Sequence, residues 1–333
     1  MTDLAPEPIA KQKPWWIKPL KLVLLLIVLA FVAKVLLTQW QKIAANDIPV
    51  VIRPLPLIGA AVMLMSVAVV QAISYRTLLG AYAGAPAWRA MPTIGWVPPM
   101  GKYIPGGAVV AAVAMLRRLK IPVPVAVAVV LVQDGLCQLA GMIFSTPLLW
   151  WQPVSERVPW AKYAAAPLIL AAAVCLWPKV FAFLVNTLLR LIRRPPLPRT
   201  PPMAKYIVPL ACAFGQWVLH GAALGFIVQS VTGQSPWPHF LLLMSFAALS
   251  QTIGYFVIFA PGGLGPREVI LLACLTPLLD RLGGLGPLAA VIVPIRAVAQ
   301  VFVDLLMGSI GLGFARLNRA DENIDPPPAT PVV

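Results

Sequence analysis

Charged side chains are scarce in this sequence. Aspartate, glutamate, lysine and arginine make up 11% of the 333 residues, whereas soluble domains average about 25%. Hydrophobic residues make up 60%, and several apolar runs approach or exceed the roughly 20 residues that a membrane-spanning helix needs. No alternating pattern of about ten residues indicates a transmembrane barrel. The sequence therefore predicts an all-α polytopic membrane protein.

Residues that bind metals or form disulfides are rarer still. Four cysteines stand singly in apolar runs, no CxxC pair occurs, and there are two histidines, which argues against a zinc site or a disulfide framework. No phosphate-binding P-loop, GxSxG or HExxH motif is present, and these are the short signatures of nucleotide, serine-hydrolase and zinc-protease chemistry. We therefore expect no metal, no cofactor and no enzymatic activity of these kinds.

Acidic residues are outnumbered by basic ones, 11 against 26, and the net charge is +15. In a soluble protein this excess would suggest nucleic acid as a partner. In a membrane protein, basic residues collect at the cytoplasmic ends of the helices. Most of the 26 do so here if the N-terminus lies in the cytoplasm. The charge pattern thus predicts the cytoplasmic (inner) membrane, with both termini cytoplasmic and no nucleic-acid partner.

Hydropathy divides the chain into a membrane domain, residues 15–320, and two short ends, 1–14 and 321–333, that we expect to be disordered. Within 179–202 we expect an amphipathic helix on the cytoplasmic surface, followed by a proline-rich linker. Six full crossings are predicted, at about 20–39, 55–79, 122–150, 161–178, 205–231 and 287–315.

Two further apolar regions, about 90–118 and 240–280, are each interrupted by Pro-Gly-Gly. Irregular backbone at membrane depth is tolerated where it is buried in protein or lines a cavity, so we expect two re-entrant hairpins. Three full crossings separate them, and an odd number brings them in from opposite sides. Paired Gly/Pro interruptions of this kind indicate an inverted repeat and a transporter's binding site.

The two interruptions carry groups that suit an anion. Each Pro-Gly-Gly precedes a helix start, where free N–H groups and the helix dipole favour negative charge. The planar guanidinium of Arg267 suits phosphate. The candidate headgroup-binding residues are Lys102, Tyr103, Pro105, Gly106, Gly107, Pro261, Gly262, Gly263, Gly265, Arg267 and Glu268.

Simpler interpretations exist for the same residues. Each Pro-Gly-Gly can be an ordinary turn between two helices. Glu268 can cap the N–H groups of its own helix. Because Arg267 and Glu268 are adjacent, we expect them to point in different directions and to have different partners; Arg267 could pair with Asp134 or Asp304 instead of a ligand.

Other polar residues fall inside predicted crossings, where a charge costs about 2.5–3.5 kcal/mol to insert. Arg296, Gln300 and Asp304 are spaced four apart, so they share one helix face and can form a polar ladder. Trp217 and His220 share a face of another crossing. The candidates for a polar path or gate are Asp134, Trp217, His220, Arg296, Gln300 and Asp304. The alternatives are salt bridges that only hold helices together and a packed histidine.

The motif FAPGGLGPRE, residues 259–268, resembles the signature of the lysylphosphatidylglycerol synthase transmembrane, or flippase-like, family. KYIPGG (102–107), WPKVFAFLVNTLLR (177–190) and the helix of Trp217 are similar to that family in the same order. The resemblance implies a membrane domain that moves lipid between leaflets. We expect this domain to stand alone, because no soluble aminoacyl-transfer domain follows the membrane region in this sequence.

These observations lead to a functional expectation. We expect a lipid translocase for an anionic phospholipid, a polyprenyl phosphate or a glycolipid, driven by gradients or by consumption of the lipid. One alternative is a non-catalytic membrane partner of a lipid-modifying enzyme. A further alternative is a membrane-embedded lipid transferase that uses Asp134 or Glu268 as a base.

Overall fold

The computed structural model describes residues 50–82, 84–103, 107–118, 121–156, 160–191, 201–257 and 265–324, with residues 37, 41, 196 and 263. Eleven α-helices and several short 3₁₀ turns make up this part of the chain, which contains no strand. The predicted crossing 20–39, the end 1–14 and the tail from residue 325 lie outside the described residues. So do Pro105, Gly106, Pro261 and Gly262 from the predicted headgroup site.

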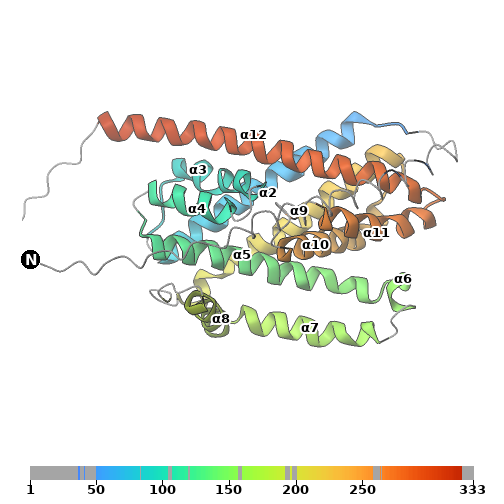
Figure 1. Cartoon of the computed structure of the whole chain (residues 1–333), viewed down its shortest axis with the longest axis horizontal. Coiled ribbons are helices and arrows are strands. Elements are labelled where there is room, and N and C mark those ends of the chain that lie inside the picture. Colours follow the sequence, from blue (N-terminus) through green and yellow to red (C-terminus); the bar gives the residue numbers. More distant parts are fainter. Residues whose placement is uncertain are drawn as a thin grey trace, which may run out of the picture.

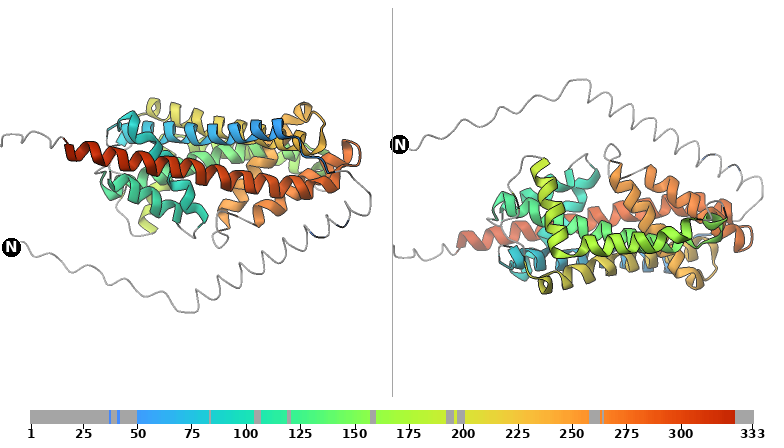
Figure 2. Two further views of the ribbon diagram at one scale, coloured as in Figure 1. Left: turned by 90° about the horizontal axis from the view of Figure 1, so that it is seen from above. Right: turned by 90° about the horizontal axis from the view of Figure 1, so that it is seen from below.

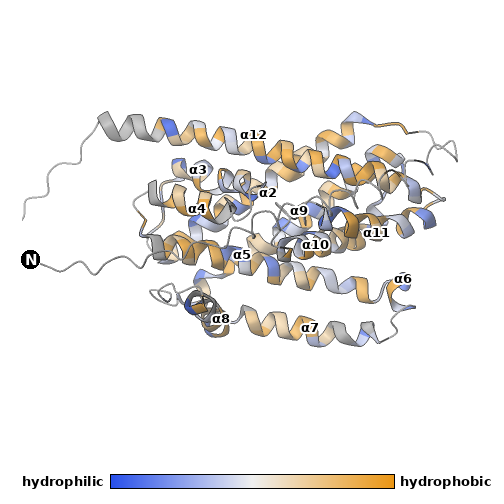
Figure 3. Cartoon of the chain, viewed as in Figure 1, coloured by the Kyte–Doolittle hydropathy of each residue, from blue (hydrophilic) through white to orange (hydrophobic). Residues whose placement is uncertain are grey.

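Four stretches of helix are long and apolar enough to cross a membrane: Pro54–Tyr82, Val125–Leu149, Met203–Thr232 and Gly286–Leu317. They contain the helices α2 (Pro54–Tyr82), α5 (Val123–Ser145), α9 (Ile207–Thr232) and α12 (Ala289–Ile324). Figure 3 shows that these helices are mainly hydrophobic, with hydrophilic residues at a few places. The chain is therefore a multi-pass membrane protein, as the composition predicts.

Two predicted elements differ in length from expectation. The predicted crossing 161–178 corresponds to α7 (Ala161–Leu176), whose 16 residues are fewer than the roughly 20 of a full span. Helix α12 continues to Ile324 and so occupies the first four residues of the expected tail. The helix forms there because Ala320, Asp321 and Glu322 do not break it.

The long helices run side by side along the longest dimension of the molecule, and α8 (Pro178–Leu191) lies across them at one end (Figure 1). Phe181 of α8 is buried and would contact any side chain added at Gly135 of α5. Phe183 and Leu191 of the same helix are 68% and 79% exposed. An apolar face that the protein leaves open is typical of a helix lying in a membrane surface, where the sequence places this segment.

Two groups of shorter helices enter the bundle from opposite ends (Figures 1 and 2). One consists of α3 (Met91–Trp96), the 3₁₀ turn Pro98–Tyr103 and α4 (Gly107–Arg118). The other consists of α10 (Phe240–Phe256) and α11 (Pro266–Arg281). We call them the first and second hairpin. Their inner ends point toward the middle of the long helices, which is where the chain places its buried charges.

Small residues allow α9 and α10 to pack backbone to backbone. A Cβ atom added at Gly221 of α9 would lie 2.8 Å from Cα of Met244 in α10. Glycine therefore sets the separation of these two helices, a common device where membrane helices pack closely. Around this contact lies a core that includes Leu224, Leu243 and Phe246, all fully buried.

We predict that Gly221→Ala lowers the stability of the protein in detergent by about 1–3 kcal/mol, the usual cost of overpacking. The matched control is Gly215→Ala on the same helix, where nothing lies within 4 Å of an added Cβ and alanine favours the helix over glycine. Thermal unfolding of the two purified variants measures the difference. Equal melting temperatures would show that α9 and α10 are not in backbone contact.

Candidate functional site

The polar residues of α12 form a hydrogen-bonded ladder. Arg296 donates from Nη1 to Oε1 of Gln300 at 3.0 Å, and Gln300 donates from Nε2 to Oδ1 of Asp304 at 3.0 Å. All three side chains are buried. The ladder expected from the spacing is present, but Arg296 and Asp304 do not pair directly: the amide of Gln300 stands between them. Each charge therefore keeps a free side for a partner on another helix.

Asp304 binds two side chains of the first hairpin. Its Oδ2 lies 2.5 Å from Nζ of Lys102 and accepts a hydrogen bond of 2.5 Å from the hydroxyl of Tyr103. Both residues were expected to hold a headgroup. In this conformation they are instead bound to a carboxylate of the protein, and they tie the inner end of the first hairpin to α12.

Glu268 organises the second hairpin. Its Oε2 accepts a hydrogen bond of 2.6 Å from the N–H of Gly265, so it caps the start of α11. Its Oε1 accepts one of 2.9 Å from Nε of Arg267 and lies 2.7 Å from Nη2. The expectation that these two neighbours have different partners is therefore wrong. In the first helical turn a glutamate folds back toward the N-terminus to cap it, and the long side chain of Arg267 reaches the same carboxylate.

Gly263, at the tip of the second hairpin, has a left-handed backbone with φ of 70°, which glycine tolerates. A Cβ there would lie 2.7 Å from the backbone of Gly254 in α10. The backbone at this glycine therefore packs closely against α10 of the same protein. Gly107 begins α4 and Gly265 precedes α11, as the sequence predicts.

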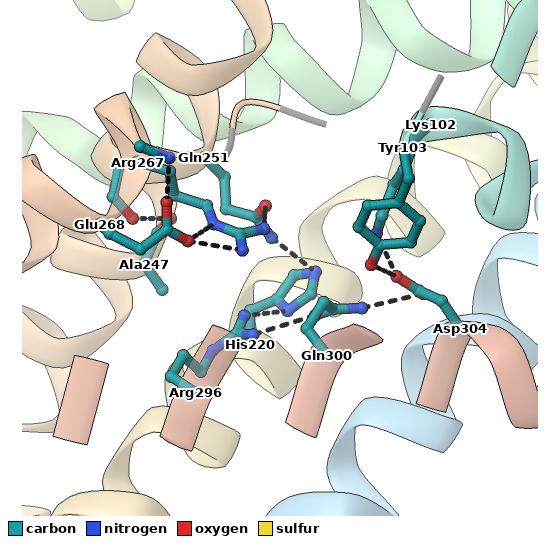
Figure 4. Close-up of polar contacts among 12 residues, drawn as sticks. Lys102, Tyr103, His220, Ala247, Gln251, Arg267, Glu268, Arg296, Gln300 and Asp304 are labelled. Atoms are coloured by element: carbon teal, nitrogen blue, oxygen red, sulfur yellow. Dashed lines mark hydrogen bonds and ion pairs between the residues drawn. The ribbon is translucent and has the colours of Figure 1, made fainter. Parts of the chain in front are cut away.

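His220 of α9 and Gln251 of α10 join the two halves (Figure 4). Nη2 of Arg296 donates to Nδ1 of His220 at 3.1 Å, and Nε2 of His220 lies 3.4 Å from Nε2 of Gln251. Oε1 of Gln251 accepts from Nη1 of Arg267 at 3.3 Å. We call the connected set the central polar network; it consists of Lys102, Tyr103, His220, Gln251, Arg267, Glu268, Arg296, Gln300 and Asp304.

The middle of the central polar network has more hydrogen-bond donors than acceptors. A guanidinium only donates, so Nδ1 of His220 accepts from Arg296, and the proton of the neutral imidazole lies on Nε2. That N–H faces the NH₂ group of Gln251, another donor. Turning the amide round would satisfy His220 but would place NH₂ against the guanidinium of Arg267. Nη2 of Arg267 also makes no aligned hydrogen bond with any described residue. An additional acceptor is needed here.

The balance of charges in the central polar network also indicates that an acceptor is missing. Lys102, Arg267 and Arg296 are cationic, and Glu268 and Asp304 are anionic. Three against two leaves one positive charge without a carboxylate, and Arg296 is the cation whose hydrogen bonds all go to neutral groups. Buried charges are normally paired, so the central polar network suits one further negative charge.

A small cavity lies where the donors gather. Its polar lining includes Ser250, Gln251, Arg267, Glu268 and Arg296. The volume is about 10 Å³, about the space of a single water molecule. A phosphate group is several times larger and does not fit into this cavity.

The remaining predicted residues lie beside this network. Asp134 of α5 accepts a hydrogen bond of 3.0 Å from the hydroxyl of Tyr255, and Trp217 donates to the carbonyl oxygen of Cys137 at 2.9 Å. The ring of Trp217 lies 5.7 Å from that of His220. Trp217 therefore supports the network without a polar contact to it, and Asp134 belongs to a second cluster.

Sequence reasoning missed Gln251, the residue that connects His220 to Arg267. The available signal was a glutamine in the predicted apolar region 240–280 ahead of the Pro-Gly-Gly. Within the described residues, no group of three His, Cys, Asp or Glu side chains could hold a metal ion. In comparisons with known proteins, no family model, no curated protein and no solved structure matches this chain.

The contacts of Asp304 lead to a prediction about pairing. Asp304 pairs with Lys102, whereas the sequence also allowed Arg267 as its partner; Arg267 pairs with Glu268. The variants Lys102→Met and Asp304→Asn should therefore be coupled: their effects on unfolding free energy should differ from additivity by about 0.5–3 kcal/mol, the range for residues in contact. The control cycle of Lys102→Met with Glu156→Gln, an exposed residue outside the central polar network, should be additive. Additive behaviour in both cycles would contradict the pairing.

Proposed function

We propose that this protein is a lipid translocase that carries an anionic headgroup, of a phospholipid, a polyprenyl phosphate or a glycolipid, between the two leaflets. The proposal rests on the surplus of donors and positive charge in the central polar network, at the depth where the two hairpins meet. A phosphate offers the acceptors that His220, Arg267 and Arg296 need, and one negative charge neutralises the network. The lipid tails would remain outside, along the apolar faces of the helices.

The membrane arrangement that fits this function has six crossings and two re-entrant hairpins, with both termini cytoplasmic in an inner membrane. The opposite entry of the two hairpins supports an inverted repeat, the plan on which many transporters place a substrate site at mid-membrane. The same arrangement agrees with the resemblance to the flippase-like family, which we retain as part of the proposal.

At each end of the central polar network, basic side chains are bound by a carboxylate of the protein, and we call each of these contacts a closure. On the side of the first hairpin, Lys102 and Tyr103 close on Asp304. On the side of the second, Arg267 closes on Glu268. A headgroup entering from either side would displace one carboxylate from its cation and bind that cation with its own phosphate, which opens that closure. The other closure stays shut, which is the requirement of alternating access.

The direct test is exchange of a fluorescent phosphatidylglycerol between the leaflets of liposomes that contain the purified protein. Exchange above that of protein-free liposomes, without the same effect on phosphatidylcholine, is the expected result. If the protein moves no anionic lipid but restores the activity of a lipid-modifying enzyme, it is an accessory subunit. If it releases a chemically new lipid, it is a transferase.

Arg296→Gln should weaken binding of phosphatidylglycerol about tenfold to a hundredfold, because a hydrogen bond to a charged group contributes about 1.5–3 kcal/mol. It should slow leaflet exchange accordingly. Glutamine keeps a polar side chain next to Gln300 while removing the uncompensated charge. Arg281→Gln, at the exposed end of α11, is the matched control and should bind and exchange lipid like the wild type. Wild-type behaviour of a folded Arg296→Gln variant would exclude the anion site.

Glu268→Gln should change which anion is preferred. Glutamine can still accept the N–H of Gly265, but it no longer neutralises Arg267, so the network gains a second uncompensated positive charge. Binding of a doubly charged phosphatidic acid relative to phosphatidylglycerol should then increase about tenfold or more, again from one charged hydrogen bond. Competition between the two lipids, read by native mass spectrometry, measures this. An unchanged ratio would separate Glu268 from the headgroup site.

A further inference from the structure

A second polar cluster lies on α5, α9 and α10, next to the central polar network. Its centre is the carboxylate of Asp134, half-buried in the apolar helix α5, with the hydroxyl of Tyr255 donating to Oδ2 at 3.0 Å. Among the side chains that the structure describes, no lysine or arginine forms an ion pair with it. An unpaired carboxylate within a membrane-spanning helix is a candidate functional group by default.

Three buried polar atoms on the helices that carry this cluster have no hydrogen-bond partner among the described residues: Oε1 of Gln138, Nε2 of Gln216 and Oγ1 of Thr252. Gln138 is one turn from Asp134 on α5, and Thr252 is one turn from Tyr255 on α10. Gln216 lies 3.8 Å from Cys137, measured from its Oε1 to Sγ. Buried polar atoms of native proteins are nearly always satisfied, and water is the partner that fits such groups.

The cluster is connected to the surface and to the network. Tyr255 is 49% exposed, so the hydroxyl that binds Asp134 belongs to a side chain open to the surroundings. On α10, Tyr255 is one turn from Gln251, which contacts Arg267 and His220. On α9, Gln216 is one turn from His220. Helices α9 and α10 therefore each carry one polar residue of the Asp134 cluster and, one turn away, one polar residue of the central polar network.

We propose that Asp134 is a proton-binding site, and that its protonation changes the hold of α10 on the central polar network. A proton neutralises the carboxylate without needing any basic side chain, and the three unpartnered polar atoms mark a hydrated route by which it can arrive. The proton-binding part stands on the second cluster alone. The coupling part rests on the proposed function.

The other titratable groups near Asp134 do not compete for this role. Tyr75 of α2 and Tyr255 of α10 face it, as does Cys137 one turn along α5. A phenol or a thiol is neutral at neutral pH, so Asp134 is the group of the cluster whose charge a proton can neutralise. α9 contributes an amide, Gln216, which does not titrate.

The coupling follows from the hydrogen bond that Tyr255 gives. A carboxylate only accepts, so in the charged state the hydroxyl of Tyr255 must point at Asp134. A protonated carboxyl group can donate, and the hydroxyl is then free to turn or to accept. Because Gln251 lies one turn away on the same helix, a change in how α10 is held at Tyr255 is passed to the contact between Gln251 and Arg267.

The test of proton binding is infrared difference spectroscopy of the full-length protein in liposomes, on exchange from mildly alkaline to mildly acidic buffer. The wild type should show the C=O band of a carboxylic acid, and Asp134→Asn should lack that band. Glu156→Gln, at an exposed position, is the matched control and should keep it. A band that is unchanged in a folded Asp134→Asn variant overturns the proposal. So does a carboxylate band that responds to sodium and not to acid.

A second variant covers the case in which Asp134→Asn does not fold. Tyr255→Phe removes the hydrogen bond to Asp134 and should shift the frequency and the titration midpoint of the same band. Tyr163→Phe, on the exposed surface of α7, should leave both unchanged. Identical titrations of the wild type and Tyr255→Phe would contradict the assignment.

Coupling is measured separately, as the response of phosphatidylglycerol exchange to a pH difference across the liposome membrane. The wild type should respond, and Asp134→Asn should exchange lipid at a rate that is independent of the pH difference. If the infrared band belongs to Asp134 but no lipid moves, the proton site stands and the proposed translocase function fails. If lipid moves equally in both proteins at every pH difference, the coupling is wrong.

Discussion

The amide of Gln300 determines how this protein can carry charge inside a membrane. It accepts from Arg296 and donates to Asp304, and so it keeps the two charges of α12 apart while satisfying one side of each. A direct salt bridge between them would neutralise both and leave nothing to hold the hairpins. With the amide between them, Asp304 remains available to the first hairpin and Arg296 to His220, through which the second hairpin is reached. The charges of Arg296 and Asp304 therefore both form the candidate site and hold the hairpins in place. If either charge loses a partner, another group has to replace that partner.

Close backbone contacts keep these groups in register. Gly221 brings α9 against Met244 of α10, and Gly263 brings the tip of the second hairpin against Gly254 of α10. His220, Gln251 and Arg267 come from the three elements joined in this way. Because the separations are set by backbone atoms and not by flexible side chains, the donors that face one another in the network cannot simply move apart. The mismatch between these donors is therefore built into the backbone, and this is the feature on which the proposed anion site rests.

The sequence alone predicted the features that depend on residues close to one another along the chain. Long apolar runs predicted α2, α5, α9 and α12, and the spacing of Arg296, Gln300 and Asp304 predicted a ladder because residues four apart share a helix face. It was uninformative where partners come from other elements: nothing in the sequence indicates that Lys102, about two hundred residues away, reaches Asp304. Gln251 was missed because a neutral amide in an apolar helix resembles many harmless ones. The pairing of Arg267 with Glu268 was misjudged because it depends on a side chain folding back over a helix start, and the spacing of Cα atoms does not show this.

The very small cavity between α9, α10, α11 and α12 has a consequence for the cell that would host this protein. A membrane stores energy as ion gradients, and any water-filled passage through it dissipates them. Here a line of polar and charged groups joins the inner ends of two hairpins that enter from opposite ends of the bundle, yet the open space beside it amounts to about 10 Å³. Polar side chains, tightly bonded to one another, fill the place that bulk water would take. Around this cavity, the residues that the structure describes thus form a hydrophilic interior that leaves no room for a column of water.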